Sequence, residues 1–185
     1  MVKELYIVNY CNPNCTPLNS ITRLTEEEAY KKAKELSDRY NGTSFGRFTD
    51  FINYYPKRIQ TEKWLYHCFT KLGGKPETKH PLYFVLQGSD FLDKWFEKGR
   101  VTKLLLENIN SEHISFTFGD SMAKFNKPEQ KEPFLKETLY EYIKKFNGDI
   151  NLFLDSIKEQ YTYIEVQLWS DLYCSELMQT SASMY

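Results

Sequence analysis

The stretch Tyr161-Thr-Tyr-Ile-Glu-Val-Gln-Leu-Trp169 alternates between apolar and polar side chains. Because successive side chains of a β-strand point to opposite faces, Ile164, Val166 and Leu168 are predicted to pack inward. The other face then carries four side chains: Tyr163, Glu165, Gln167 and Trp169. A carboxylate and an amide between two large rings can bind a planar ligand, since the rings stack on it and the polar groups bond its edge. The alternative is an exposed sheet face on which aromatic residues pair across strands.

A second alternating run, His113-Ile-Ser-Phe-Thr-Phe118, carries three more polar side chains. His113, Ser115 and Thr117 share one face of this predicted strand, opposite the apolar residues of the run. If this face lies beside that of Tyr163, hydroxyl groups and an imidazole converge on Glu165. Glu165 could then orient a ribose hydroxyl or act as a base, with His113 as the acid. The alternative is again a solvated face.

A second candidate acid, His80, stands in Lys79-His80-Pro81, ahead of a strand predicted over Leu82–Gln87. A residue before proline is held extended, so His80 would lie at a sheet end, where α/β proteins often place ligands. Tyr83 adds an aromatic hydroxyl on one face of that strand. A lone histidine is more often structural or exposed, and that interpretation of His80 stays open.

The four cysteines give little support for a metal site. Cys11 and Cys15 have a spacing that zinc sites use, and His67-Cys68 could complete four ligands. Cys68, however, lies on the apolar stripe of a predicted helix, where free cysteine behaves as a small hydrophobic residue. The sequence has no paired CxxC, G-x-G-x-x-G, Walker-type loop, H-E-x-x-H or nucleophile elbow. We therefore predict no metal site and assign no cofactor.

Charge and composition limit the classes of partner. The formal net charge is −1, whereas nonspecific nucleic-acid binding usually requires a strongly basic domain. No segment approaches the roughly 18 apolar residues that span a bilayer, and no secretory signal is found. A soluble cytoplasmic protein with reduced thiols is therefore expected. The many Lys, Asn, Ile, Tyr and Phe residues are typical of an AT-rich bacterial or phage genome.

Aromatic residues are unusually abundant, at 16% of the chain, with 14 Tyr and 13 Phe. Most are expected in the core, because each aromatic side chain buries a large area. The stretch Phe45–Arg58 interleaves aromatic and basic residues, as in modules that stack bases and bind phosphates. Phe48, Phe51 and Tyr55 also fall at helical spacing, which favours core packing instead.

Segments of opposite periodicity alternate along the 185 residues and predict one α+β domain over residues 1–169. Strands are expected at Glu4–Tyr10, Leu82–Gln87, Val101–Leu106, His113–Phe118 and Thr162–Trp169. Helices are expected from the Thr25–Glu28 capping box to Tyr40, from Pro56 to Leu72, after Ser89 (burying Phe91, Leu92, Trp95 and Phe96), over Phe134–Phe146 and after Asp149, with a short one within 44–55. Short helix-free links predict a mixed or antiparallel sheet of about five strands packed with about five helices. Residues 170–185 lose periodicity and are predicted to form a loosely ordered tail.

Three segments together resemble the ADP-ribosyltransferase-like fold: Pro81–Gly99 (PLYFVLQGSDFLDKWFEKG), His113–Phe118 and Glu165. Members such as the RNA 2′-phosphotransferases have a strand with Tyr-His-Gly-Thr, a helix ending in Gly, a His-led strand and a late Glu. The resemblance implies nucleotide or RNA-end chemistry, although Phe84 stands where the family has the histidine that holds the nicotinamide nucleotide. Taken whole, the chain looks similar to uncharacterised small cytosolic proteins of AT-rich Gram-positive bacteria and their phages.

These observations favour a ligand-binding domain with a polar and aromatic cleft for a small molecule or a nucleotide. In its enzymatic form the domain would process nucleotides or RNA ends. The alternative is a noncatalytic domain that uses an aromatic surface to bind a partner protein or to form a homodimer.

Overall fold

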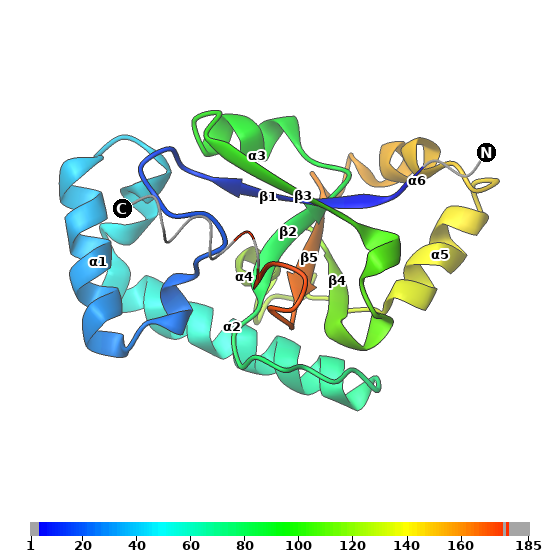
Figure 1. The fold of residues 1–185 in the computed structure, drawn as a ribbon, viewed down its shortest axis with the longest axis horizontal. Coiled ribbons are helices and arrows are strands. Elements are labelled where there is room, and N and C mark those ends of the chain that lie inside the picture. Colours follow the sequence, from blue (N-terminus) through cyan, green and yellow to red (C-terminus); the bar gives the residue numbers. More distant parts are fainter. Residues whose placement is uncertain (1–3, 176, 178–185) are drawn as a thin grey trace.

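A five-stranded antiparallel sheet lies at the centre of the computed structural model, which describes residues 4–175 and 177 (Figure 1). The strands are β1 (Tyr6–Cys11), β2 (Leu82–Leu86), β3 (Arg100–Leu105), β4 (Ile114–Phe118) and β5 (Ile164–Leu168). Their order is β3-β1-β2-β5-β4, and every neighbouring pair is antiparallel. The predicted α+β class is confirmed, and each predicted strand is present with shifted ends.

Helices cover both faces of the sheet (Figure 1). They are α1 (Glu26–Arg39), α2 (Phe51–Lys71), α3 (Asp90–Trp95), α4 (Ser121–Lys124), α5 (Lys136–Lys144) and α6 (Ile150–Ile157). Two start signals read from the sequence are present, because Thr25 and Glu28 form the capping box of α1 and Asp149 caps α6. Helices α5 and α6 pack on one side of the sheet, whereas α1 and α2 lie on the other.

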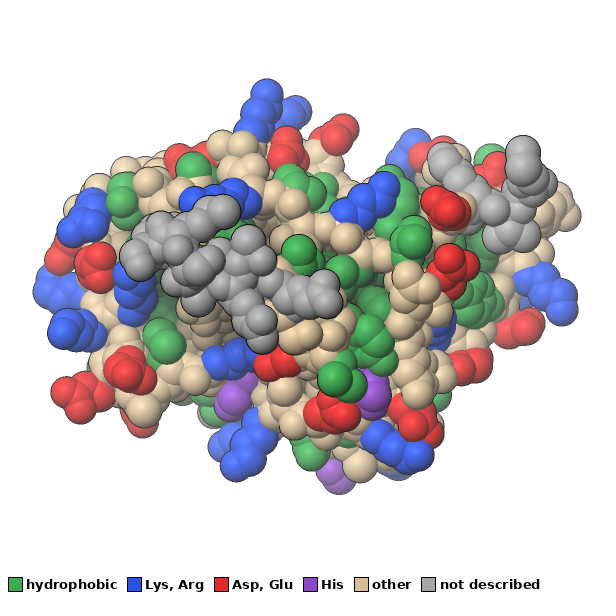
Figure 2. All heavy atoms as spheres, viewed as in Figure 1, with side chains coloured by type: hydrophobic (Ala, Val, Ile, Leu, Met, Phe, Trp, Pro, Cys, Tyr) green, Lys and Arg blue, Asp and Glu red, His purple; other side chains and the backbone are tan. Residues whose placement is uncertain are grey.

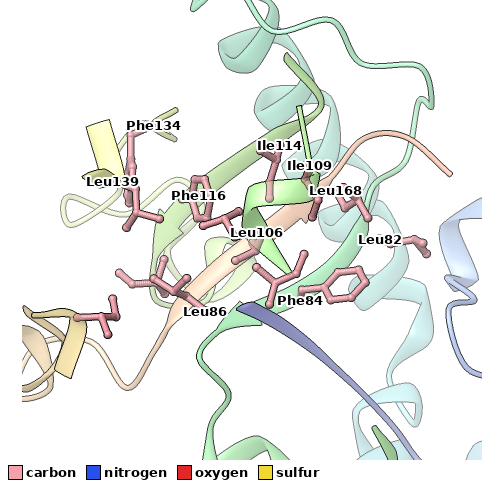
Figure 3. Close-up of a cluster of buried hydrophobic side chains, with 14 of the residues drawn as sticks. Leu82, Phe84, Leu86, Leu106, Ile109, Ile114, Phe116, Phe134, Leu139 and Leu168 are labelled. Atoms are coloured by element: carbon pink, nitrogen blue, oxygen red, sulfur yellow. The ribbon is translucent and has the colours of Figure 1, made fainter. Parts of the chain in front are cut away.

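The face toward α5 and α6 carries the main hydrophobic core. The strand register places Phe84, Val166 and Phe116 side by side in β2, β5 and β4. Leu139 of α5 and Phe153 of α6 pack over this row in the same cluster, part of which Figure 3 shows. Burying a large apolar side chain contributes about 1.5–3 kcal/mol, and a one-residue slip would expose the whole row. The core therefore fixes which side chains of β5 point to the opposite face.

The opposite face has two kinds of cover. Over β4 and β5, Leu65 and Phe69 of α2 pack directly on Trp169, whose indole stacks on the Phe69 ring with centroids 5.6 Å apart. Farther along, α1, α2 and the short 3-10 helix Ser44–Phe48 form a separate aromatic cluster. This second cluster does not seal the sheet, and a cavity lies against strands β1 and β2.

The helix predicted to begin at Pro56 begins earlier. Pro56 lies inside α2, which starts at Phe51. Proline lacks the N–H that would bond the carbonyl of Ile52 in the preceding turn. Ile52 is 70% exposed, so water can supply that donor and the helix continues through the proline.

The prediction that α3 buries its aromatic residues is also wrong. Phe91 is 52% exposed and Trp95 is 45% exposed, and the two rings stack on each other with centroids 6.2 Å apart. Both side chains line the cavity instead of entering the main core. Helical spacing identifies an apolar stripe but does not show whether the stripe meets a packed core or an open space.

The C-terminal segment predicted as a loosely ordered tail is described in part. Within it, Cys174 is 1% exposed in the main core, and Asp171 pairs with Arg23 at 2.8 Å. Residues 176 and 178–185 of that segment lie outside the described residues.

Acidic and basic side chains are interspersed over the face of the molecule shown in Figure 2. Among the helices of the described ranges, none has the length and apolar character needed to cross a membrane.

Candidate functional site

Glu165 is the second residue of β5, on the face that also meets the cavity. The register pairs it with Val85 of β2 on one side and with Thr117 of β4 on the other. Only 7% of the residue is exposed. The alternation of β5 therefore places a carboxylate inside the protein, between the sheet and the elements that cover it.

Hydrogen bonds join the polar side chains of β4 and β5 in a continuous row. Trp169 Nε1 donates to Ser115 Oγ at 2.9 Å, and Ser115 Oγ donates to Gln167 Oε1 at 2.8 Å. Gln167 Nε2 donates to Thr117 Oγ1 at 3.0 Å and to Glu165 Oε1 at 2.9 Å. Buried networks whose members are satisfied hold their side chains rigidly. The row therefore fixes the position of the Glu165 carboxylate.

The closest contact of the Glu165 carboxylate is with α4. Ser121 Oγ donates to Oε1 at 2.5 Å, and the Ser121 backbone N–H donates to the same oxygen at 3.4 Å. Thr117 Oγ1 also lies 3.4 Å from Oε1. Within the described chain Oε1 receives every hydrogen bond to this carboxylate, and Oε2 receives none. One oxygen is thus held by the protein, and the other is available to a ligand.

The cavity beside Glu165 has a volume of about 850 Å³. Its lining combines polar and aromatic side chains, among them Tyr83, Tyr163, Arg58, Phe91 and Trp95. Pockets for small ligands usually measure roughly 300–1,000 Å³ and have such a mixed lining. One lining atom, Asn9 Oδ1, is buried without a hydrogen-bond partner in the part of the chain that is described. Buried polar atoms are rarely left in this state, and a ligand or water usually supplies the partner.

The structure divides the sequence-predicted ligand residues into two groups. Tyr83, Tyr163 and Glu165 line the cavity. The others lie away from it, in the hydrogen-bonded row under α2: Ser115, Thr117, Gln167 and Trp169. Trp169 is completely buried, so the ring predicted to stack on a ligand stacks on Phe69 instead.

The electrostatic setting of Glu165 disfavours its charge. Burial is the main cause, and together with the negative charge of Asp120 it raises the pKa of Glu165 from 4.5 to about 7. The cation of Arg58 and the hydrogen bonds from Ser121 and Gln167 act in the opposite direction. The protonated and ionised forms of Glu165 therefore coexist near neutral pH, as a group that exchanges protons with a ligand requires.

His80, which the sequence offered as a candidate acid, pairs with a second buried carboxylate, Glu62 of α2. Glu62 is fully buried, accepts hydrogen bonds from Arg58 Nε at 3.1 Å and Thr22 Oγ1 at 3.2 Å, and lies 2.6 Å from His80 Nδ1. The Arg58 guanidinium lies 3.8 Å from the centre of the Tyr83 ring. His80 is thus paired with Glu62 and does not line the cavity.

His113 lies in the 3-10 helix Ser111–His113, just before β4 and not within it. Its Nδ1 is 2.8 Å from the Tyr173 hydroxyl, and its Nε2 is 3.8 Å from a carboxylate oxygen of Glu77. These contacts hold the C-terminal segment and the loop before β2. The structure gives the ring no hydrogen bond to Glu165, so the expected convergence is limited to the hydroxyl groups.

Sequence reasoning did not single out Arg58, Asp120 or Ser121 as site residues. Asp120 is the N-cap of α4 and Ser121 is its first residue, and this helix, Ser121–Lys124, is too short for any periodicity to show. Arg58 has a weak signal, because it precedes Glu62 by four residues and such pairs meet on one helix face. Phe84, which stands at the histidine position of the ADP-ribosyltransferase-like pattern, packs in the main core on the face opposite Glu165.

No group of three or more His, Cys, Asp or Glu residues within the described ranges is placed to hold a metal ion. Comparisons with protein-family models, with curated proteins and with solved structures find no match to this chain. Its function must therefore be argued from the geometry of the cavity and of Glu165.

Proposed function

We propose that this chain is a small-molecule-binding domain whose cavity takes a planar, hydrogen-bonding ligand of the nucleoside or nucleotide class. The observation that carries this proposal is the state of Glu165, a buried carboxylate with Oε1 held by several donors and Oε2 without one. A ligand N–H or O–H group at Oε2 would complete its coordination, because hydrogen bonds to a carboxylate are charge-assisted and strong in a site with little water.

The aromatic lining supports a planar ligand. Tyr83 of β2 and Tyr163, just before β5, line the cavity together with Glu165, and Phe91 and Trp95 supply partly exposed rings on α3. Aromatic faces stack on bases with little preference among them, contributing about 1–3 kcal/mol per base. Asn9 Oδ1 offers a further acceptor that needs a donor.

In the enzymatic form of the proposal, Glu165 moves the proton. A general base is most effective when its pKa lies near the working pH. Glu165 would accept a proton from a ribose hydroxyl or a bound water at Oε2, while Ser121 and Gln167 keep Oε1 in place. His80 and His113 would not serve as its acid partner, since both are engaged elsewhere.

The test is a thermal-shift screen of the full chain against nucleosides, nucleotides, NAD and short RNAs. We expect at least one compound to raise the Tm, and the shift to disappear in Glu165→Ala. The variant Glu141→Ala, an exposed position on α5, controls for the loss of a carboxylate. No shift with any compound, or an equal shift in Glu165→Ala, would contradict the proposal.

A noncatalytic interaction domain is the second candidate, because the stacked rings of Phe91 and Trp95 remain half exposed beside the edge strand β3. Exposed aromatic pairs are frequent at protein interfaces. This candidate predicts a dimer that forms with rising concentration and is lost in Trp95→Ser. If the protein is a monomer at every concentration and a compound raises its Tm, the interaction domain is contradicted and only the first proposal remains.

A further inference from the structure

The helical wall of the cavity contains a partly buried cation that the Glu165 site does not explain. Arg47 lies in the 3-10 helix Ser44–Phe48 and lines the cavity. Its Nη1 donates to the Ser44 carbonyl, and its guanidinium lies 4.5 Å from the centre of the Phe48 ring and 5.8 Å from that of Phe96. Its surroundings are mainly aromatic.

Arg47 has no carboxylate partner within ion-pair distance among the described residues. Burial lowers its pKa, and Tyr54 is its principal polar neighbour. Removing a cation from water is unfavourable unless a counter-charge is supplied, so buried charges are normally paired. Arg58, by contrast, has Glu62 as its partner.

Most of the charged residues that line the cavity are basic. Lys32, Lys57 and Arg58 join Arg47 on the cavity surface, whereas Asp120 and Glu165 are the acidic residues there. Glu165 carries less than a full charge near neutral pH. On the helical wall Lys32 pairs with Glu35 and Arg58 pairs with Glu62, so Arg47 and Lys57 supply its excess positive charge, whereas the wall at β5 and α4 carries the acids.

We propose that Arg47 is the anion subsite of the cavity, so that the ligand is a nucleoside phosphate whose phosphate pairs with Arg47 while its base or ribose reaches Glu165. This inference rests on the proposed function and adds the charge of the ligand to it. Arg58 links the two ends, because its charge acts on both Arg47 and Glu165. A planar guanidinium matches phosphate oxygens in two parallel hydrogen bonds.

The test compares the four common nucleosides with their 5′-monophosphates by calorimetry, using the wild type, Arg47→Met and Arg39→Met. Arg39 is an exposed arginine of α1, so Arg39→Met removes the same charge from the surface. Hydrogen bonds to charged groups contribute enough to predict that the monophosphate binds about 10- to 100-fold more tightly than its nucleoside. Arg47→Met should reduce this gain to below about twofold and leave nucleoside affinity unchanged, whereas Arg39→Met should keep the gain.

The outcomes separate the two proposals. Equal affinity for nucleoside and monophosphate, or a gain that persists in Arg47→Met, overturns the subsite and leaves the nucleoside site standing. Binding of neither class overturns both.

The stability of the ligand-free protein gives an independent readout. Because Phe48 and Phe96 can pack against a methionine, Arg47→Met should have an unchanged or higher Tm once the unpaired charge is removed. A lower Tm together with weaker nucleoside binding would show that Arg47 is structural, and it would overturn the subsite.

Discussion

The substitution Glu165→Gln tests whether burial of the ionised Glu165 carboxylate lowers the stability of the folded protein. Glutamine keeps the shape, and its Oε1 can still accept from Ser121 and Gln167. Its amide N–H groups would point toward the cavity, where Glu165 has the unbonded Oε2. The variant therefore removes the charge and retains the packing.

The expected effect depends on pH. The pKa of Glu165 is raised from 4.5 to about 7, so between these values the folded protein keeps a proton that the unfolded chain releases. Stability of the wild type consequently falls as pH rises from 4.5 to about 7 and is then constant with respect to this group. At about 1.4 kcal/mol per pKa unit, the full loss is about 3 kcal/mol. Glu165→Gln should match the wild type near pH 4.5 and exceed it by up to about 3 kcal/mol at pH 8.

The assay is urea unfolding of both proteins at pH 5, 6, 7 and 8, supported by thermal scans. For a chain of this length the difference at pH 8 corresponds to a Tm increase of roughly 6–12 °C. Glu141→Gln, at an exposed site of α5, controls for the change in net charge. A stability difference between wild type and Glu165→Gln that is the same at all four pH values would refute the reasoning.

Three further substitutions test the elements that hold the site. Glu62→Gln leaves Arg58 without a carboxylate and should lower the free energy of unfolding by about 3–5 kcal/mol in urea; a loss below about 1 kcal/mol would contradict the pairing. Gly99→Ala places a Cβ 2.1 Å from the Cys11 carbonyl oxygen, so the backbone there must shift and the free energy of unfolding should fall by about 1–3 kcal/mol. Gly46→Ala, whose Cβ would meet no atom within 4 Å, should not disturb the packing. Trp169→Phe removes the donor to Ser115 and should cost about 1–3 kcal/mol by the same assay, and an unchanged midpoint would show that the row is not needed.

The periodicity of the sequence predicted the sheet well, because strand alternation reports directly on which side chains the core needs. Ile164, Val166 and Leu168 are all in the main core, and this fixed the direction of Glu165. The same pattern cannot show what covers the other face. From the sequence, that face could be either an exposed surface or a ligand cleft. In the structure, α2 covers the part of it around Trp169, and a cavity lies against the other part.

The parts of the site that could not be predicted come from distant segments. Arg47 and Arg58 reach the cavity because the segment with the aromatic cluster of α1 and α2 and strands β1 and β2 line the same cavity. The sequence of the stretch that contains them, Phe45–Arg58, fits either a base- and phosphate-binding surface or a part of the core. In the structure its phenylalanines are buried and its two arginines line the cavity. The positions of His80 and His113 were predicted from the strands next to them. Their actual contacts are with Glu62 of α2 and with Tyr173 of the C-terminal segment, which strand periodicity does not reveal.

The most direct test of the account measures protons released when a neutral nucleoside binds, by calorimetry at pH 7 in two buffers of different ionisation enthalpy. A ligand donor at Oε2 favours the ionised carboxylate, so the wild type should release a fraction of a proton and Glu165→Gln should release none. Binding without proton release, or equal release by the two proteins, would contradict a contact between Glu165 and the ligand.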